Sequence, residues 1–159
     1  MTTVTTTTGH QGTRTYPVRR GLAFLVSAMV MLVPLQAQRA EAVTEDEAAF
    51  SSMVNDVRDQ RGVRSLKLTE RLSSLARRHS RQMAARNQLY HSNLRRTFRG
   101  FNYRMVGENV GYGGSLDQLL NAFLDSPPHR QNLVGRWRRT GVGVYWDGDR
   151  VWITQLFYT

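Results

Sequence analysis

The chain has 159 residues, contains no cysteine and carries a formal net charge of +10, with 22 Lys and Arg against 12 Asp and Glu. This length is typical of a single domain, and the absence of cysteine excludes disulfide-based folding and thiolate metal sites. All the cations but one are arginine, a bias that genome composition alone can produce. The charge is compatible either with a solvated basic surface or with anionic partners such as acidic polymers, lipid headgroups or nucleic acid.

The N-terminal residues are typical of an export signal. Residues 1–13 are rich in threonine and lack an apolar period, so we expect them to be disordered. A basic segment ending in Arg19-Arg20 precedes the apolar run 21–35, which is shorter than the ~20 residues that a membrane span needs. Ala40-Glu41-Ala42 follows as a cleavage pattern. We therefore predict that residues 1–42 are a leader plus signal peptide, cut between Ala42 and Val43, and that residues 43–159 are the mature domain.

Two alternatives to this export signal stay open. Arg19-Arg20 fits a twin-arginine signal as well as the general secretory route, and the apolar run could instead serve as an uncleaved anchor. Pro34 and the shortness of the run argue against an anchor. An exported domain without cysteine does not depend on oxidative folding, which favours a bacterial envelope or extracellular protein.

Two amphipathic helices are expected at the start of the mature chain. Thr44 and Glu47 form a capping box, and apolar residues then recur at helical spacing until Gly62 ends the helix. Thr69 begins a second helix, whose arginines lie mostly off its apolar stripe. His79 lies on that stripe, so we expect a packed histidine bonded to the backbone.

The middle of the chain is harder to assign. Residues 88–114 are rich in glycine and irregular, and a loop of this length is usually functional or carries short helices. Ser115 then begins a third helix, with Gln118 at the capping-box position. Ser126-Pro127 begins a short fourth helix that carries His129.

The C-terminal segment changes from the period of a helix to that of a strand. Residues 141–146 and 151–157 alternate as strands around the turn Asp147-Gly148-Asp149, which predicts a hairpin. Helices followed by paired strands predict an α+β fold, with helices packed on an antiparallel sheet.

Four segments occur in a fixed order: Ala76–Ala84, Leu89-Tyr90-His91, Gly107-Glu108-Asn109-Val110 and Phe123–Leu133, followed by the closing strands Gly141–Val144 and Trp152–Phe157. Together they resemble the CAP superfamily (cysteine-rich secretory proteins, antigen 5 and plant pathogenesis-related proteins), and especially its bacterial SCP-like branch. The resemblance covers residues 46–158. It implies an α-β-α sandwich with a central antiparallel sheet and a further strand near Met105-Val106.

The resemblance also implies a polar cleft with two histidines and two acidic residues. His91, Glu108 and His129 match three of these positions, and the matched motifs add Asn109 and Gln155 to the expected ligand-binding cleft. Trp152 and Ser126 replace a histidine and a glutamate of the eukaryotic members. The fourth cleft group is therefore unassigned.

Some family members bind a divalent metal in this cleft, which makes His91, Glu108 and His129 the candidate ligands, with zinc as the candidate ion. Two histidines and one carboxylate are ordinary zinc ligands and leave an open position. The alternative is that Glu108 caps loop amides while the histidines line a wet, metal-free cleft.

Three functions are compatible with these observations. The first, which we favour, is a secreted, monomeric and non-catalytic binding module for a small amphipathic ligand, a peptide or a cell-wall fragment. The second is a metal-assisted hydrolase of the peptidase kind, in which Glu108 would be the general base. The third is a cationic protein that binds an anionic envelope surface through charge. Dinucleotide, P-loop and established nucleic-acid motifs are absent from the sequence.

Overall fold

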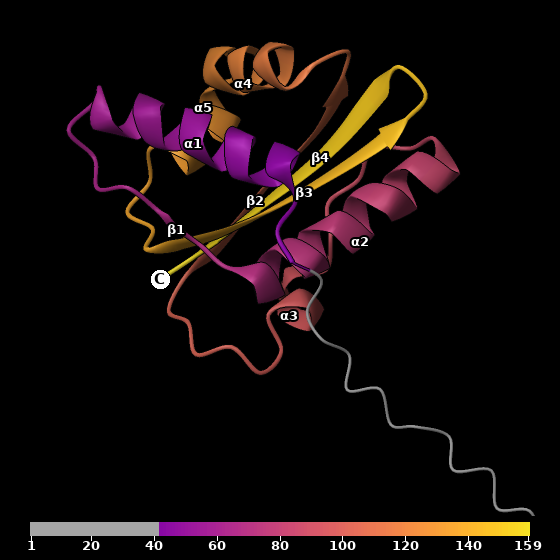
Figure 1. Ribbon diagram of the computed structural model, residues 1–159. Coiled ribbons are helices and arrows are strands. Elements are labelled where there is room, and N and C mark those ends of the chain that lie inside the picture. Colours follow the sequence, from indigo (N-terminus) through magenta and orange to yellow (C-terminus); the bar gives the residue numbers. More distant parts are fainter. Residues whose placement is uncertain (1–41) are drawn as a thin grey trace, which may run out of the picture. The chain divides into compact units, whose positions relative to one another are not determined.

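The computed structural model describes residues 42–159, so the predicted signal peptide lies outside the described residues. The described chain forms five helices and four strands (Figure 1). The helices are α1 (Glu45–Asp59), α2 (Glu70–Arg86), α3 (Leu94–Thr97), α4 (Leu116–Asp125) and α5 (Pro127–Leu133). The strands are β1 (Lys67–Leu68), β2 (Val106–Gly113), β3 (Arg139–Asp147) and β4 (Arg150–Tyr158). Within residues 42–159, no helix is both long and apolar enough to cross a membrane.

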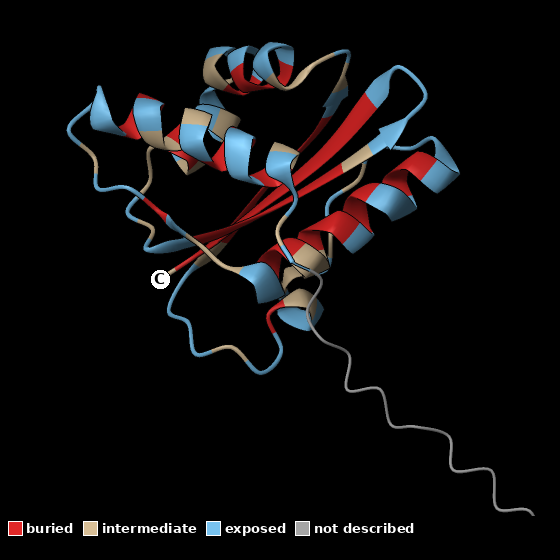
Figure 2. Ribbon diagram, viewed as in Figure 1, coloured by how far each residue is buried: buried red, intermediate tan, exposed pale blue. Residues whose placement is uncertain are grey.

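The strands form one sheet, in the order β1-β3-β4-β2, between two helical layers. Side chains of β4 alternate between the layers: Ile153 packs in the cluster formed with α1, α4 and α5, whereas Leu156 packs in the cluster formed with α2 and α3. The two layers lie on opposite sides of the sheet in Figure 1, and the strands between them are buried in Figure 2. The predicted α+β fold and α-β-α sandwich are confirmed.

The sheet is mixed, whereas the sequence predicted a purely antiparallel one. β2, β4 and β3 pair antiparallel, and the predicted hairpin between β3 and β4 is confirmed. β1 pairs parallel to β3, through Lys67 with Arg139 and Leu68 with Thr140. Two residues are too few to show the alternation that identifies a strand in a sequence, so the pattern alone indicates only a connector there.

Residues 88–114 are not an irregular loop throughout, because they contain α3 and the edge strand β2. Glycine is depleted in strands, so the glycine-rich segment 107–113 does not resemble one in sequence. The glycines make room for aromatic side chains that pack on this face of the strand. A Cβ on Gly111 would lie 2.9 Å from the Phe123 ring, and one on Gly107 would lie 3.0 Å from Trp137. The strand near Val106, which the family resemblance implied, is confirmed.

Helix α2 lies almost directly on the backbone of β3. A Cβ added to Gly143 would lie 1.9 Å from the backbone nitrogen of Arg77, and one on Gly141 would lie 2.4 Å from the backbone of Leu72. Hydrogen bonds fix this contact: Ser80 donates to the carbonyl of Gly143 (2.8 Å). The two glycines therefore set the position of the helix that forms one wall of the functional region.

Arg58 is a fully buried cation at the end of α1. Its guanidinium donates hydrogen bonds to the carbonyls of Arg64, Leu133 and Gly135, over 2.6 to 3.0 Å. Burial lowers the pKa of Arg58. An arginine still remains charged at neutral pH, and these carbonyls disperse its charge. Arg58 therefore ties α1 to the segment that follows α5 and has a structural role.

Candidate functional site

Glu108 occupies the edge strand β2 with its side chain turned toward the α2 layer. It pairs with Leu156 on β4, and residues paired across an antiparallel ladder point to the same face. Leu156 packs against α2, which fixes the direction of the Glu108 carboxylate. The Glu108 side chain is only 1% exposed.

His91 binds this buried carboxylate. The His91 Nδ1 lies 2.8 Å from Oε1 of Glu108, and the backbone N–H of Ser92 donates to the same oxygen over 2.8 Å. The other oxygen, Oε2, is buried and has no hydrogen-bond partner in the described chain. The His91 side chain is 63% exposed. A carboxylate bonded to Nδ1 fixes the orientation of an imidazole and favours a proton on that nitrogen, which leaves Nε2 free to contact a ligand.

His129 lies on α5 and is held by its own helix. Its Nδ1 is 2.8 Å from the Ser126 hydroxyl, and its ring lies against Phe123 with 5.0 Å between ring centroids. Burial lowers the pKa of His129 below its usual value, and the positive form of His91 lowers it further. The structure therefore brings His91 and Glu108 into contact and places His129 within electrostatic reach of His91.

Asn109 and Gln155 do not line a solvent-reachable cleft with these groups. They pair with each other across β2 and β4, one position along from Glu108, and therefore point to the opposite face. Both are fully buried. Asn109 donates to the backbone carbonyl of His129 (3.1 Å) and accepts from Asn132 (2.9 Å), so it fixes α5 on the sheet. Neither side chain therefore faces the same side of the sheet as Glu108, because successive residues of a strand point to opposite faces.

The residues present do not fit the three-ligand metal centre that the resemblance implied. Within residues 42–159, no three His, Asp, Glu or Cys side chains lie where they could share a metal ion. Glu108 Oε1 and His91 Nδ1 are directed at each other, and His129 Nδ1 is directed at Ser126. The arrangement provides one oriented, exposed imidazole on a buried carboxylate.

A cavity of about 570 Å³ lies beside His91, between α2 and residues 90–97. Its wall includes neither Glu108 nor His129; it consists of Leu75, Arg78, His79, Gln82, Arg86, Tyr90, His91, Ser92, Asn93, Arg96 and Thr97. His79 is buried and its Nε2 is 2.8 Å from the carbonyl of Tyr90, which confirms the predicted packed histidine.

Sequence reasoning missed most of this cavity wall. The spacing of Arg78, Gln82 and Arg86, each four residues from the next, places them on one helix face and was the available signal. What the sequence did not show is that residues 90–97 lie opposite this face.

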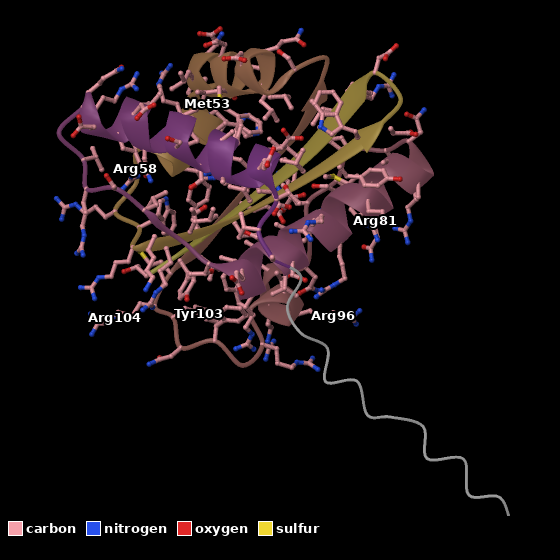
Figure 3. All side chains as sticks on the ribbon, viewed as in Figure 1. Met53, Arg58, Arg81, Arg96, Tyr103 and Arg104 are labelled. Carbon is pink, nitrogen blue, oxygen red and sulfur yellow. The ribbon has the colours of Figure 1, made fainter. Side chains whose placement is uncertain are left out.

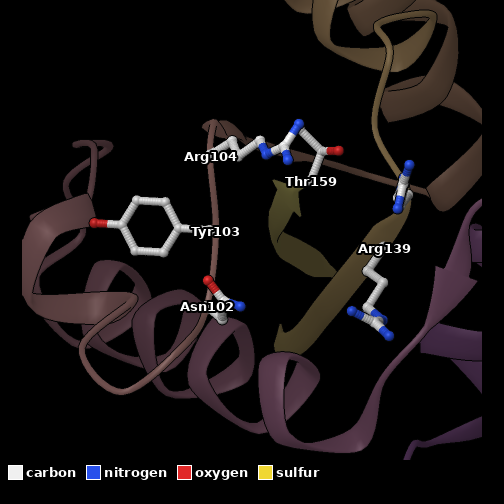
Figure 4. A pocket seen from close by; sticks show the side chains of 6 residues that line it. Asn102, Tyr103, Arg104, Arg139 and Thr159 are labelled. Atoms are coloured by element: carbon white, nitrogen blue, oxygen red, sulfur yellow. The ribbon is translucent and has the colours of Figure 1, made fainter.

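A second cavity, of about 290 Å³, lies around Arg104, Arg138 and Arg139 (Figure 4). It contains none of the predicted site residues.

The fold and this site define a class: a three-layer α-β-α domain with a histidine–carboxylate pair at the free edge of its sheet. The sequence profile of CAP, the cysteine-rich secretory protein family, matches residues 52–157. The chain belongs to this family, although it contains no cysteine.

Relatives and solved structures agree with this assignment. The uncharacterized protein YkwD of Bacillus subtilis (strain 168) is 25% identical over 140 residues, covering 77% of this chain and 54% of the relative. The chain thus spans about half the length of this curated relative. An outer surface protein of Borrelia burgdorferi has a TM-score of 0.67 at 16% identity, covering 75% of this chain and 96% of that one. An extracellular SCP-domain protein of Bacillus anthracis has a TM-score of 0.65 at 23% identity, covering 71% of this chain and 40% of that one. These structural likenesses show the fold.

Proposed function

We propose that this CAP domain is a secreted, non-catalytic binding module, and that His91 presents its Nε2 to a polar ligand such as a peptide or a cell-wall fragment. The observation that carries the proposal is the contact between an exposed imidazole and a buried carboxylate. Secretion is supported by the signal-like N-terminal sequence and by the extracellular and outer-surface relatives.

The burial of Glu108 favours binding over hydrolysis. A general base must come within hydrogen-bond reach of the water or group that it deprotonates. Glu108 is 1% exposed, and one of its oxygens already accepts from His91 and Ser92. Its role is therefore to orient His91, and the metal-assisted hydrolase becomes the alternative that the experiment below tests.

The cavity wall favours a polar ligand over an amphipathic one. Pockets for apolar ligands are lined mainly by aliphatic and aromatic side chains. Here the only aliphatic side chain in the wall is that of Leu75, and the only aromatic side chain besides the two histidines is that of Tyr90. The remaining wall residues offer hydrogen-bond donors and acceptors, which suit a glycan or a peptide.

The test measures sedimentation of the exported protein with peptidoglycan sacculi from which anionic polymers have been removed. It is run at about 0.5 M NaCl, where exposed charges are screened within a few ångströms. We expect binding that survives EDTA and releases no soluble fragments. His91→Gln and Glu108→Gln should each weaken binding about five- to tenfold, because a ligand hydrogen bond is lost or misaligned. Asn121→Ala, an exposed change on α4, is the control and should bind like the parent.

Three outcomes would contradict the proposal. Binding that disappears at high salt, with no effect of His91→Gln, would indicate a cationic protein that acts through charge. Release of fragments that depends on metal and is abolished by Glu108→Gln would indicate a hydrolase. An exported protein whose N-terminal sequence includes residues 21–35 would indicate an anchor in place of a cleaved signal.

A further inference from the structure

The cavity beside His91 has a wall that contains three arginines and no acidic residue. Arg78 and Arg86 extend from α2, and Arg96 extends from α3 on the other side. Figure 3 labels Arg96 beside α3. Arg78 and Arg86 are eight residues apart, about two helical turns, and therefore lie on the same face of α2. Two separate elements thus place positive groups around one hollow.

None of these three arginines has a carboxylate partner within residues 42–159. The ion pairs of the described chain join Arg77 to Glu47 and His91 to Glu108. Arg78 donates to the Ser74 hydroxyl over 3.0 Å. Arg86 donates to the Tyr90 hydroxyl over 3.0 Å and lies 5.4 Å from the centroid of that ring.

These neutral contacts position two guanidinium groups without neutralising them. Guanidinium groups hold phosphate oxygens through paired, charge-assisted hydrogen bonds, which are shorter and stronger than neutral ones. Three such groups around one hollow suit an anion with several acceptor oxygens, and a phosphate monoester provides both the charge and the oxygens. A lone carboxylate carries one negative charge and would compensate less of the charge of the three guanidinium groups than a phosphate monoester does.

We propose that this cavity binds the phosphate monoester group of a ligand through Arg78, Arg86 and Arg96. The inference deepens the proposed function and rests on it, since it names the chemistry of a ligand for the same cavity. A phosphate monoester occurs both in soluble glycerol phosphates and in the headgroup of phosphatidic acid, so the experiment has an arm for each source.

The first arm titrates the exported protein with glycerol 3-phosphate and follows binding by calorimetry, with glycerol as the phosphate-free control. The test variant is Arg78→Gln/Arg96→Gln. Its matched control is Arg81→Gln/Arg95→Gln, which removes the same charge from the same two helices but from residues outside the cavity wall. Figure 3 shows Arg81 on α2, away from Arg96. We expect saturable binding of glycerol 3-phosphate and none of glycerol. The test variant should weaken binding about tenfold or more, and the control less than about twofold.

The second arm sediments the same proteins with phosphatidylcholine vesicles containing phosphatidic acid, whose headgroup is a phosphate monoester. Vesicle binding that requires Arg78 and Arg96 would identify a lipid headgroup as the source, whereas binding of glycerol 3-phosphate alone would identify a soluble ester. Either result supports the inference. Equal losses in the test and control variants, or no saturable binding in either arm, would overturn it.

The two proposals fail separately. If sacculi are not bound but glycerol 3-phosphate binds and requires the cavity arginines, the proposed function is wrong and the phosphate site stands. If His91→Gln weakens binding to stripped sacculi but no protein binds glycerol 3-phosphate or the vesicles, the phosphate site is wrong and the binding module stands.

Discussion

Glu47 and Arg77 form a buried, two-point ion pair that joins helices from opposite faces of the sheet. Arg77 Nε and Nη2 lie 2.7 and 2.6 Å from the two carboxylate oxygens of Glu47. The same carboxylate accepts from the backbone N–H groups of Thr44 (3.0 Å) and Val144 (3.3 Å). β1 pairs with only two residues of β3, so it leaves the rest of this edge of β3 without a partner strand. Glu47 accepts the backbone hydrogen bond of Val144 in that unpaired part.

Replacing Glu47 with glutamine should destabilise the domain by about 3 kcal/mol, because removing one partner of a buried ion pair leaves an uncompensated charge. Chemical denaturation measures this loss. Glu45→Gln, at an exposed position in the same helical turn, is the control and should cost less than about 1 kcal/mol. Equal effects of the two changes would show that the ion pair contributes little.

Gly143→Ala should destabilise the domain by about 3 kcal/mol or more, because overpacking forces the backbone to move. The added Cβ would lie 1.9 Å from the backbone nitrogen of Arg77, where no side chain can rotate away. Gly114→Ala, whose Cβ would meet only the flexible end of Gln118 at 3.3 Å, should change stability by less than about 1 kcal/mol. Thermal unfolding of both variants provides the comparison.

His91→Gln should raise the pKa of His129 toward its usual value. The positive charge of His91 is one of the two causes that lower the pKa of His129, and burial, the larger cause, remains in the variant. Titration followed by NMR of the His129 ring protons measures the change. Asn93→Ala, an uncharged change in the same loop, should leave the pKa of His129 where it is. A fall in this pKa in the His91 variant would contradict the arrangement.

His129 should make the domain less stable in mild acid. Its pKa is lower in the folded protein than the value of about 6.5 expected in the unfolded chain. As the pH falls below that value, the unfolded chain binds a proton that the folded protein does not. The stability contributed by neutral His129 is therefore complete above about pH 6.5 and is lost as the pH falls through the folded pKa. The free energy of unfolding is measured by chemical denaturation at several pH values between neutral and about pH 5. Its fall with decreasing pH should be less steep for His129→Asn than for the parent. Parallel curves would show that His129 has no part in this dependence.

Local patterns in the sequence predicted most of the helices and the hairpin. The capping box of Thr44 and Glu47 is present at the start of α1, and the Ser126-Pro127 pair begins α5. These signals act within a few residues, so they can be identified without the fold. The sequence places the end of the first helix at Gly62, whereas α1 ends at Asp59 and Gly62 adopts a positive φ in the turn that follows.

The candidate site was predictable only in part. The resemblance to the CAP family placed His91, Glu108 and His129 in one cleft, and the structure brings the first two side chains into contact. Gln155 entered the predicted cleft through the same resemblance, but the strand alternation directs it away from Glu108. In the sequence, Arg78 and Arg96 indicate only a general basic surface, because no local pattern shows that two helices enclose a cavity.

The sequence by itself determined the α+β class, most helix boundaries, the hairpin and the CAP family, since each depends on short-range periodicity, capping or ordered motifs. Only the tertiary structure decided which face of β2 each polar side chain occupies, that Glu47 meets Arg77 across the sheet edge, and that the arginines of α2 and α3 surround one cavity. These contacts join residues far apart in the chain. Their geometry depends on strand register and helix packing, which are fixed only when the layers assemble.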